Sequence, residues 1–260
     1  MSELPLVLIT GAANGIGRAT ALELARGGVR MGLIDIDSTG LESLANELRD
    51  AGAIFVAQTA DVSRRWPLRQ AVKEIEAALG QVDVLVACAG FGTLTLVPDL
   101  ALDTLRRTFE VNMFGVAESI EAVLPGMLSR GRGHIVGVAS LAGYRGFPWM
   151  ISYSASKAAL IAYLEALRPG LARRGITVTT ACPGFVRTAM STGVPYKRKV
   201  KMIEPEQAAQ HLVRAILRRP RNCVFPWSMR MGLAILKHMP DRLFDWLMRR
   251  AGPEALAVDF

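Results

Sequence analysis

Tyr153 and Lys157 stand four positions apart in the stretch ISYSASKAAL, residues 151–160. On a helix, side chains with this spacing share one face and can serve one site. A free phenol ionises at a pKa of about 10, so it accepts protons poorly at neutral pH, and a neighbouring ammonium favours its phenolate. Such a pair could take the proton of an alcohol. Taken alone, the spacing also fits a helix with one packed aromatic and one surface lysine.

Two strand ends carry residues suited to a nucleotide. Residues 10–17 read TGAANGIG and join an apolar run to a helix. Glycines there let the backbone approach a pyrophosphate, which the first N–H groups of the helix and its dipole stabilise. Between a strand and a helix near the N-terminus, such a turn predicts a dinucleotide site. Asp61-Val62 closes a later strand, and its carboxylate and amide could contact the adenine edge.

Asp35 closes the second apolar run. A carboxylate there can accept hydrogen bonds from both hydroxyls of the adenosine ribose and repels a 2′-phosphate. Asp37 competes for this role, because strand ends are uncertain by two or more residues, and either acid could be an ordinary cap. Neither Ile36 nor Asn14 offers a cation to a 2′-phosphate, so the sequence favours NAD over NADP.

The elements that would position these residues follow a regular order. Apolar runs of strand length occur at 6–10, 31–36, 53–58, 82–89, 134–140 and 176–183, with a last strand near 223–225. Segments 17–28, 39–52 and 69–80 between them show the apolar spacing of helices and end near glycine, and a further helix is expected at 205–219. Buried strands alternating with amphipathic helices predict a doubly wound parallel α/β sheet of about seven strands. Ligands bind at the carboxyl ends of such strands, where the strand order reverses.

Together these motifs resemble the short-chain dehydrogenase/reductase family, over residues 4 to about 225. The family's T-G-x-x-x-G-x-G is matched by residues 10–17, its adenine-side Asp by Asp61, and the segment over the nicotinamide by residues 183–188. Its catalytic Asn, Ser, Tyr and Lys are matched by Asn112, Ser140, Tyr153 and Lys157, and Ser140 stands thirteen residues before Tyr153, as in the family. The resemblance implies a Rossmann-type fold and an NAD(P)-dependent oxidoreductase that acts on a secondary alcohol or ketone. It also implies a homo-dimer or homo-tetramer.

The resemblance further implies a role for each residue. Tyr153 would exchange the proton, Lys157 would favour its phenolate and hold the nicotinamide ribose, and Ser140 would hold the substrate oxygen. Asn112 would hold a water that links Lys157 to solvent. The expected cofactor contacts are Thr10, Gly11, Asn14, Gly15, Ile16, Gly17, Asp35, Asp61, Val62, Ala89, Gly90, Tyr153, Lys157, Pro183, Gly184, Val186 and Thr188.

One position departs from the family. Most members carry N-N-A-G after the fourth strand, whereas this chain has Ala87-Cys88-Ala89-Gly90. The small Ala-Gly pair that lets the cofactor lie against the strand end is kept. The Asn side chain thought to brace the sheet is missing, and no catalytic group is lost.

We expect one domain at residues 1–225, with a substrate lid at about 189–203, and a C-terminal helical extension of the same domain at 226–260. Apolar residues expected around the substrate predict a hydrophobic alcohol or ketone, such as a steroid, retinoid, fatty or isoprenoid compound, rather than a sugar. They are Phe91, Leu94, Leu141, Tyr144, Phe147, Trp149 and Phe185. The run KRKVK at 197–201 in the lid is either a solvated loop or a contact for an acidic substrate group or a lipid headgroup.

The net charge of +8 is unevenly distributed. Residues 1–186 hold 17 Lys/Arg and 17 Asp/Glu, whereas residues 187–260 hold 14 and 6, so the whole surplus, 14 minus 6, lies in the last part of the chain. Such a distribution argues against a general nucleic-acid-binding surface.

The C-terminal segment alternates apolar and basic residues, and Pro240 divides it into two short helices. The pair could lie on an anionic membrane, cover the substrate pocket or pack against another subunit, and the last two roles together are favoured. No uncharged run approaches the roughly 20 residues of a membrane span. The start of the chain lacks the pattern of a signal peptide. We therefore expect a cytoplasmic protein, with peripheral membrane contact as the alternative.

Metal chemistry is not indicated. The cysteines, Cys88, Cys182 and Cys223, are far apart, have no C-x-x-C spacing and are expected to be buried thiols, and the three histidines are scattered. A dinucleotide-sensing scaffold without catalysis is the competing class of function, but such a protein would be expected to lose the Tyr or the Lys, and both are present.

Overall fold

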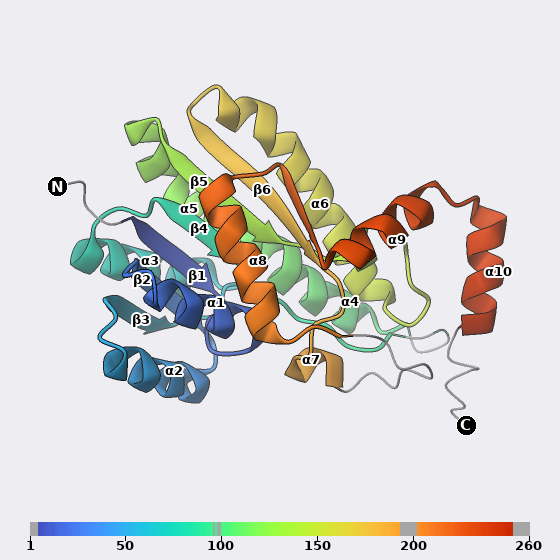
Figure 1. The fold of residues 1–260 in the computed structure, drawn as a ribbon, viewed down its shortest axis with the longest axis horizontal. Coiled ribbons are helices and arrows are strands. Elements are labelled where there is room, and N and C mark those ends of the chain that lie inside the picture. The colour runs from blue at the N-terminus through green and yellow to red at the C-terminus, as the bar shows by residue number, and fades with distance from the viewer. Residues whose placement is uncertain (1–4, 96, 98–99, 193–201, 252–260) are drawn as a thin grey trace.

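The computed structural model describes residues 5–95, 97, 100–192 and 202–251. Seven parallel strands in these residues form one sheet in the order β3-β2-β1-β4-β5-β6-β7 (Figure 1). The strands are β1 (Leu6–Thr10), β2 (Arg30–Asp35), β3 (Phe55–Thr59), β4 (Val84–Ala87), β5 (Gly133–Val138), β6 (Ile176–Pro183) and β7 (Asn222–Phe225). This confirms the predicted doubly wound parallel sheet, and the strand order reverses between β1 and β4.

Helices cover both faces of the sheet. Their bounds are α1 (Gly15–Ala25), α2 (Ser38–Asp50), α3 (Arg65–Leu79), α4 (Leu102–Phe109), α5 (Gly115–Arg130), α6 (Ile151–Ala172), α7 (Ala189–Thr192), α8 (Pro205–Arg218), α9 (Trp227–His238) and α10 (Asp241–Ala251). A π-helical turn, η1 (Glu110–Phe114), joins α4 to α5, and a 3₁₀ turn, η2 (Leu141–Gly143), follows β5.

The sheet separates two hydrophobic cores. One core packs α3, α5 and α6 against the sheet through residues such as Ile75, Ile120 and Leu164. The other packs α1, α2 and α8 through residues such as Leu24 and Leu44, and α1 lies beside α8 in Figure 1. The central strands β1 and β4 are buried along their whole length, as expected of a sheet covered on both faces.

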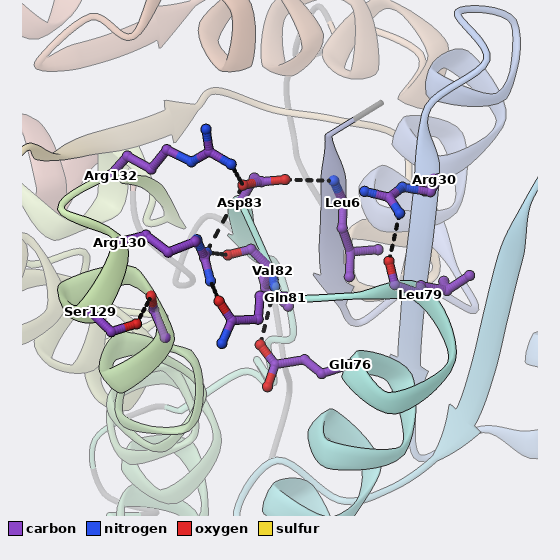
Figure 2. Close-up of polar contacts among 11 residues, drawn as sticks. Leu6, Arg30, Glu76, Leu79, Gln81, Val82, Asp83, Ser129, Arg130 and Arg132 are labelled. Atoms are coloured by element: carbon purple, nitrogen blue, oxygen red, sulfur yellow. Dashed lines mark hydrogen bonds and ion pairs between the residues drawn. The ribbon is translucent and has the colours of Figure 1, made fainter. Parts of the chain in front are cut away.

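The amino edge of the sheet is held by polar contacts around Asp83 (Figure 2). One carboxylate oxygen of Asp83 accepts from the backbone N–H of Leu6 at 3.1 Å, and the other lies 3.9 Å from the guanidinium groups of Arg130 and Arg132. Arg130 also donates to the carbonyl of Val82 at 2.6 Å and to the side chain of Gln81. These contacts join the starts of β1 and β4 to the end of α5, on the edge opposite to the carboxyl ends of the strands.

The C-terminal segment forms two helices with Pro240 between them, as predicted. Phe244 in α10 is buried, stacks edge-on against Phe147 with ring centres 6.4 Å apart, and lies 4.4 Å below the guanidinium of Arg145. Arg145 also forms an ion pair with Asp241 at 3.1 Å. Strand β7 ends at Phe225, and the division of the chain there stays a prediction. Within the described ranges, every helix is too short or too polar to cross a bilayer.

Candidate active site

A cavity of about 750 Å³ opens at the carboxyl edge of the sheet. It begins at the loop after β1, crosses the point where the strand order reverses, and ends under α9. Residues from both halves of the chain line it, so it brings together side chains that are far apart in the sequence.

The loop after β1 forms one end of the cavity. Gly11 has a left-handed φ of +72°, and a Cβ there would lie 2.6 Å from the Cα of Ala89, so only glycine lets β1 and β4 approach this closely. A Cβ on Gly17 would lie 2.0 Å from the carbonyl oxygen of Gly11, which explains the glycine at the start of α1. The loop therefore has the compactness that a phosphate-binding turn needs.

Helix α1 begins without a side-chain cap. Asn14 occupies the N-cap position, but its side chain donates to Asp37 at 2.8 Å instead of accepting from the first turn. The first turn of α1 carries no acidic residue. The positive end of the helix dipole is thus open to an anion from the cavity, and these residues fit a dinucleotide pyrophosphate.

Asp35, the last residue of β2, and Asp37, two residues later, both line the cavity. Asp35 accepts from the backbone N–H of Ala13 at 2.8 Å and from that of Asp37 at 3.0 Å, so it also holds the first loop in place. Asp37 caps α2 by accepting from the N–H of Gly40 at 3.0 Å, and this bond and the one from Asn14 lower the pKa of its carboxyl. The structure thus gives Asp37 the role of cap and leaves both carboxylates beside the same part of the cavity.

Asp61 and Val62 line the cavity after β3, where Arg107 joins them. One oxygen of Asp61 accepts from the N–H and the hydroxyl of Ser63, and the other accepts from Arg107 at 3.3 Å. These bonds outweigh the effect of burial and lower the pKa of Asp61. The sequence interpretation missed Arg107, because its position in α4 shows no spacing that distinguishes it from the adjacent Arg106.

Ser140, Tyr153 and Lys157 all line the cavity. The ammonium of Lys157 lies 5.7 Å from the centre of the Tyr153 ring, within the range of a cation–π contact. Its Nζ donates to the carbonyl of Val138 at 2.9 Å, which leaves two of its three hydrogens for other acceptors. Burial lowers the pKa of Lys157 to about 8, so the amine is still mainly protonated at neutral pH. The Oγ of Ser140 accepts from the N–H of Ala142 at 3.2 Å, and its own hydrogen can be donated elsewhere.

Asn112 lies behind the cavity wall. Its Oδ1 accepts from the N–H of Phe91 at 2.7 Å, and its Nδ2 donates to the carbonyl of Phe91 at 2.8 Å and to the Oγ of Ser156 at 2.9 Å. Ser156 in turn donates to the carbonyl of Tyr153 at 2.8 Å. In this geometry Asn112 ties the loop after β4 to the helix that carries Tyr153. Its role in holding a water stays a prediction.

Thr10 also lies outside the cavity, although it was expected to contact the cofactor. It is buried at the end of β1, and its Oγ1 accepts from the N–H of Ala89 at 3.4 Å. The other expected cofactor contacts all line the cavity: Gly11, Asn14, Gly15, Ile16, Gly17, Asp35, Asp61, Val62, Ala89, Gly90, Tyr153, Lys157, Pro183, Gly184, Val186 and Thr188.

The far end of the cavity is apolar. Of the residues expected around a substrate, Phe91, Leu141, Phe147, Trp149 and Phe185 line it, whereas Leu94 and Tyr144 do not. The sequence interpretation missed several apolar lining residues, namely Met150, Met190, Met229, Leu233 and Leu236. The last three come from α9, where a helical apolar spacing was visible but its direction relative to the cavity was not.

Of the predicted lid at about 189–203, the structure describes residues 189–192 and 202–203. Helix α7 supplies Ala189 and Met190 to the cavity wall, and a bridge between Val186 and Ile203 closes the segment. The basic run at 197–201 lies outside the described residues.

The three cysteines are free thiols; Cys182 is buried, and Cys88 and Cys223 are partly buried. Cys88, at the position that departs from the family, lines the cavity, and burial raises the pKa of its thiol to about 11. It is therefore a neutral thiol beside Lys157 rather than a nucleophile. No group of three or more His, Cys, Asp or Glu in the described part of the chain could hold a metal ion.

Comparison with known proteins shows the family of the chain. Residues 5–199 match the family described as short chain dehydrogenase. The 17-beta-hydroxysteroid dehydrogenase 13 of Rattus norvegicus is 34% identical over 250 residues, which cover 94% of this chain and 82% of the relative.

Two solved structures are similar over most of their length. A short chain dehydrogenase/reductase from Burkholderia phymatum in complex with NAD superposes with a TM-score of 0.81, at 26% identity, over 90% of this chain and 92% of the other. An alcohol dehydrogenase from the archaeon Thermococcus sibiricus complexed with 5-hydroxy-NADP gives a TM-score of 0.77, at 28% identity, over 86% of this chain and 96% of the other.

Proposed function

The chain belongs to the short-chain dehydrogenase family, and on this premise we propose that it transfers a hydride between NAD and a hydrophobic secondary alcohol or ketone. The observation that carries the proposal is the continuity of the cavity. A polar end with an open helix N-terminus and an apolar end meet at Tyr153 and Lys157. A nicotinamide cofactor laid from the first loop toward this pair would bring its reactive ring to the substrate.

When bound, the cofactor supplies or accepts the hydride, and the protein manages one proton. We assign the acid/base role to Tyr153, whose phenolate the buried ammonium of Lys157 stabilises across the 5.7 Å to the ring. The two remaining hydrogens of Lys157 can hold the nicotinamide ribose. Ser140 donates its hydroxyl hydrogen to the substrate oxygen and so stabilises the charge that develops there. Asn112 fixes α6 through Ser156 and thereby positions Tyr153.

The preference for NAD rests on Asp35 and Asp37. Both carboxylates line the cavity at the end where the adenosine ribose would lie, and both would repel a 2′-phosphate. The cations among the described lining residues are Arg107, which is paired with Asp61, and Lys157 at the nicotinamide end. Related structures contain either NAD or an NADP analogue, so the family alone does not decide the cofactor.

The apolar end supports a steroid, retinoid or lipid-like substrate. It is lined by aromatic and aliphatic side chains from four parts of the chain, which suit a bulky hydrophobic molecule better than a sugar. The name of the rat relative, a hydroxysteroid dehydrogenase, agrees with this class.

We also propose that the chain associates with itself through an apolar groove on its surface. Phe114 is 58% exposed and borders a shallow surface groove with Leu105 and Phe109, on the outside of α4 and η1. A second copy would cover this apolar groove in a homo-dimer or homo-tetramer. Light scattering of the purified chain would measure the oligomer. A cytoplasmic location stays a prediction.

An absorbance assay of nicotinamide reduction tests the function. Steroid, retinoid and long-chain secondary alcohols are offered with NAD and with NADP in parallel, and sugar alcohols serve as the comparison. We expect turnover with a hydrophobic alcohol and NAD. Tight binding of NAD in calorimetry without turnover of any alcohol or ketone would instead favour the dinucleotide-sensing scaffold.

A further inference from the structure

Helix α9 has two apolar sides that face in opposite directions. At about 100° per residue, Met229, Leu233 and Leu236 fall on one side, and all three line the cavity. Trp227, Met231 and Ile235 fall on the other side, where they are 72%, 55% and 65% exposed. A helix that is apolar on both sides is expected to be covered on both. In the described part of the chain, only the cavity side is covered.

Basic residues accompany the exposed stripe Trp227–Met231–Ile235. The sequence of α9, WSMRMGLAILKH, contains Arg230 and Lys237 and no acidic residue. The next helix repeats the combination, since Trp246 is 48% exposed with the guanidinium of Arg250 lying 4.0 Å from its ring. Arg242 and Arg249 are exposed on the same side of α10. Lys237 lies 5.7 Å from the ring of Tyr144, and α10 also carries Asp241 and Asp245, so the exposed cation of α9 itself is Arg230 and the two helices together keep a surplus of basic residues.

We propose that the stripe Trp227–Met231–Ile235 docks on an anionic lipid surface, with the helix axis lying along it. Apolar side chains with tryptophan, flanked by Arg and Lys, are the combination that binds at the boundary of headgroups and acyl chains. An anionic headgroup layer supplies the charge that this helix lacks. Contact of α9 with itself in a second copy would instead bring the Arg230 residues of both copies together with no acid in either helix to offset them.

Docking would place α9, which forms one wall of the cavity, against the lipid. Because the same helix contributes Met229, Leu233 and Leu236 to the cavity, an apolar alcohol dissolved among acyl chains would reach the apolar end without crossing bulk water. This second step rests on the proposed dehydrogenase function, whereas docking itself does not.

Vesicle flotation tests the docking. The full chain is mixed with vesicles of phosphatidylcholine alone or with added phosphatidylglycerol. We expect binding to the anionic vesicles, weaker binding to the neutral ones, and release by high salt. The double variant Met231→Gln/Ile235→Gln should lose roughly tenfold or more in binding. A matched control, Trp66→Gln/Leu217→Gln, changes two residues that are 79% and 75% exposed on α3 and α8 and should bind like the original chain.

Charge is tested in the same way. Arg230→Glu/Arg242→Glu should weaken anionic binding, whereas Lys73→Glu/Arg174→Glu, which changes the net charge equally at exposed sites elsewhere, should weaken it less. Thermal unfolding and turnover of a water-soluble alcohol should be unchanged in Met231→Gln/Ile235→Gln, so lost flotation cannot be blamed on lost folding or chemistry. Equal flotation of this variant and the original chain, or no flotation on anionic vesicles, overturns the proposal. So does an oligomer that dissociates in this variant while flotation persists, because the stripe would then be an interface between copies.

Discussion

Lys157 illustrates how one buried residue can serve two partners. Its Nζ is anchored on the carbonyl of Val138, so its cation stays near the Tyr153 ring even though burial lowers its pKa to about 8. This fixed charge is what gives the tyrosine its proposed role, because a phenol without a neighbouring cation is a poor acid/base group at neutral pH.

Tyr153→Phe should keep the cofactor and lose the chemistry. The ring and its packing remain, but the hydroxyl that exchanges the proton is gone, so kcat should fall by about 10²–10⁴-fold. Calorimetry should give an NAD affinity close to that of the original chain. A variant with a near-normal rate would contradict the assigned acid/base role.

Asp35→Ala should shift the cofactor preference toward NADP. Removing a carboxylate that would lie beside a 2′-phosphate relieves roughly 1–4 kcal/mol of repulsion, which corresponds to at least about a fivefold gain in NADP affinity. The affinity for NAD should fall because the ribose loses an acceptor. Asp37→Ser keeps a residue able to cap α2 and measures the share of the second carboxylate separately. A larger shift in Asp37→Ser than in Asp35→Ala would assign the discrimination to Asp37.

At the residue scale, most of the residues that the motifs predicted line one cavity, because spacing and residue type together constrain position. Thr10 and Asn112 belong to the same motifs but lie behind the cavity. Sequence motifs do not distinguish a residue that touches a ligand from one that holds the residue that does. Arg107 was missed for the converse reason, since its contact with Asp61 depends on how α4 is placed against β3.

At the element scale, α10 packs against the segment between β5 and α6 that carries the cavity residue Phe147. The contact of Phe244 with Phe147 and Arg145 is the principal anchor of α10 on the rest of the structure described here. The two short helices were predicted from Pro240 and the basic-apolar pattern. Covering the substrate pocket was one of three alternatives for the pair, because a helical pattern gives an apolar face but not the surface that receives it; in the structure α9, but not α10, lines the cavity.

Phe244→Ala should loosen the packing around Phe147 at the apolar end of the cavity without affecting the nucleotide end. Losing contact with about 60 Å² of apolar substrate surface costs about 1.5 kcal/mol, so the KM for a bulky hydrophobic substrate should rise roughly tenfold. The affinity for NAD should be unchanged. Leu243→Ala, at a residue 46% exposed on the same helix, is the matched control. Equal KM values for Phe244→Ala and the control would show that α10 does not support the apolar end of the cavity.

At the scale of the whole molecule, global stability should depend on pH through His134. This residue of β5 is completely buried, and its Nε2 contacts the Oγ1 of Thr179 at 2.9 Å, which donates to the carbonyl of Pro220. The Thr179 hydrogen is thus in use, so Nε2 is the donor of a neutral imidazole. Burial, and then the charge of Arg219, lower the pKa of His134 to about 4.

A folded-state pKa below the unfolded value means that the unfolded chain binds more protons in acid. The contribution of His134 to stability is therefore present in full only above pH 6.5 and is lost as the pH falls toward 4. Between pH 7 and 5 the loss from this residue alone should be about 2 kcal/mol. Urea unfolding of the original chain and of His134→Gln at both pH values measures it as the difference between the two proteins. An equal pH dependence in both would exclude His134 as the source.

The two edges of the sheet differ in what they contain. At the carboxyl edge lies the cavity, whereas the amino edge holds the contacts of Asp83, Arg130 and Gln81 that join β1, β4 and α5 (Figure 2). For an engineer this separation defines where a longer working lifetime can be sought. Mutant libraries confined to the contacts at the amino ends of the strands are expected to alter the tolerance of the protein to heat and solvent and to leave the substrate range unchanged. Libraries confined to Met229, Leu233 and Leu236, the residues of α9 that line the cavity, are expected to alter the substrate range.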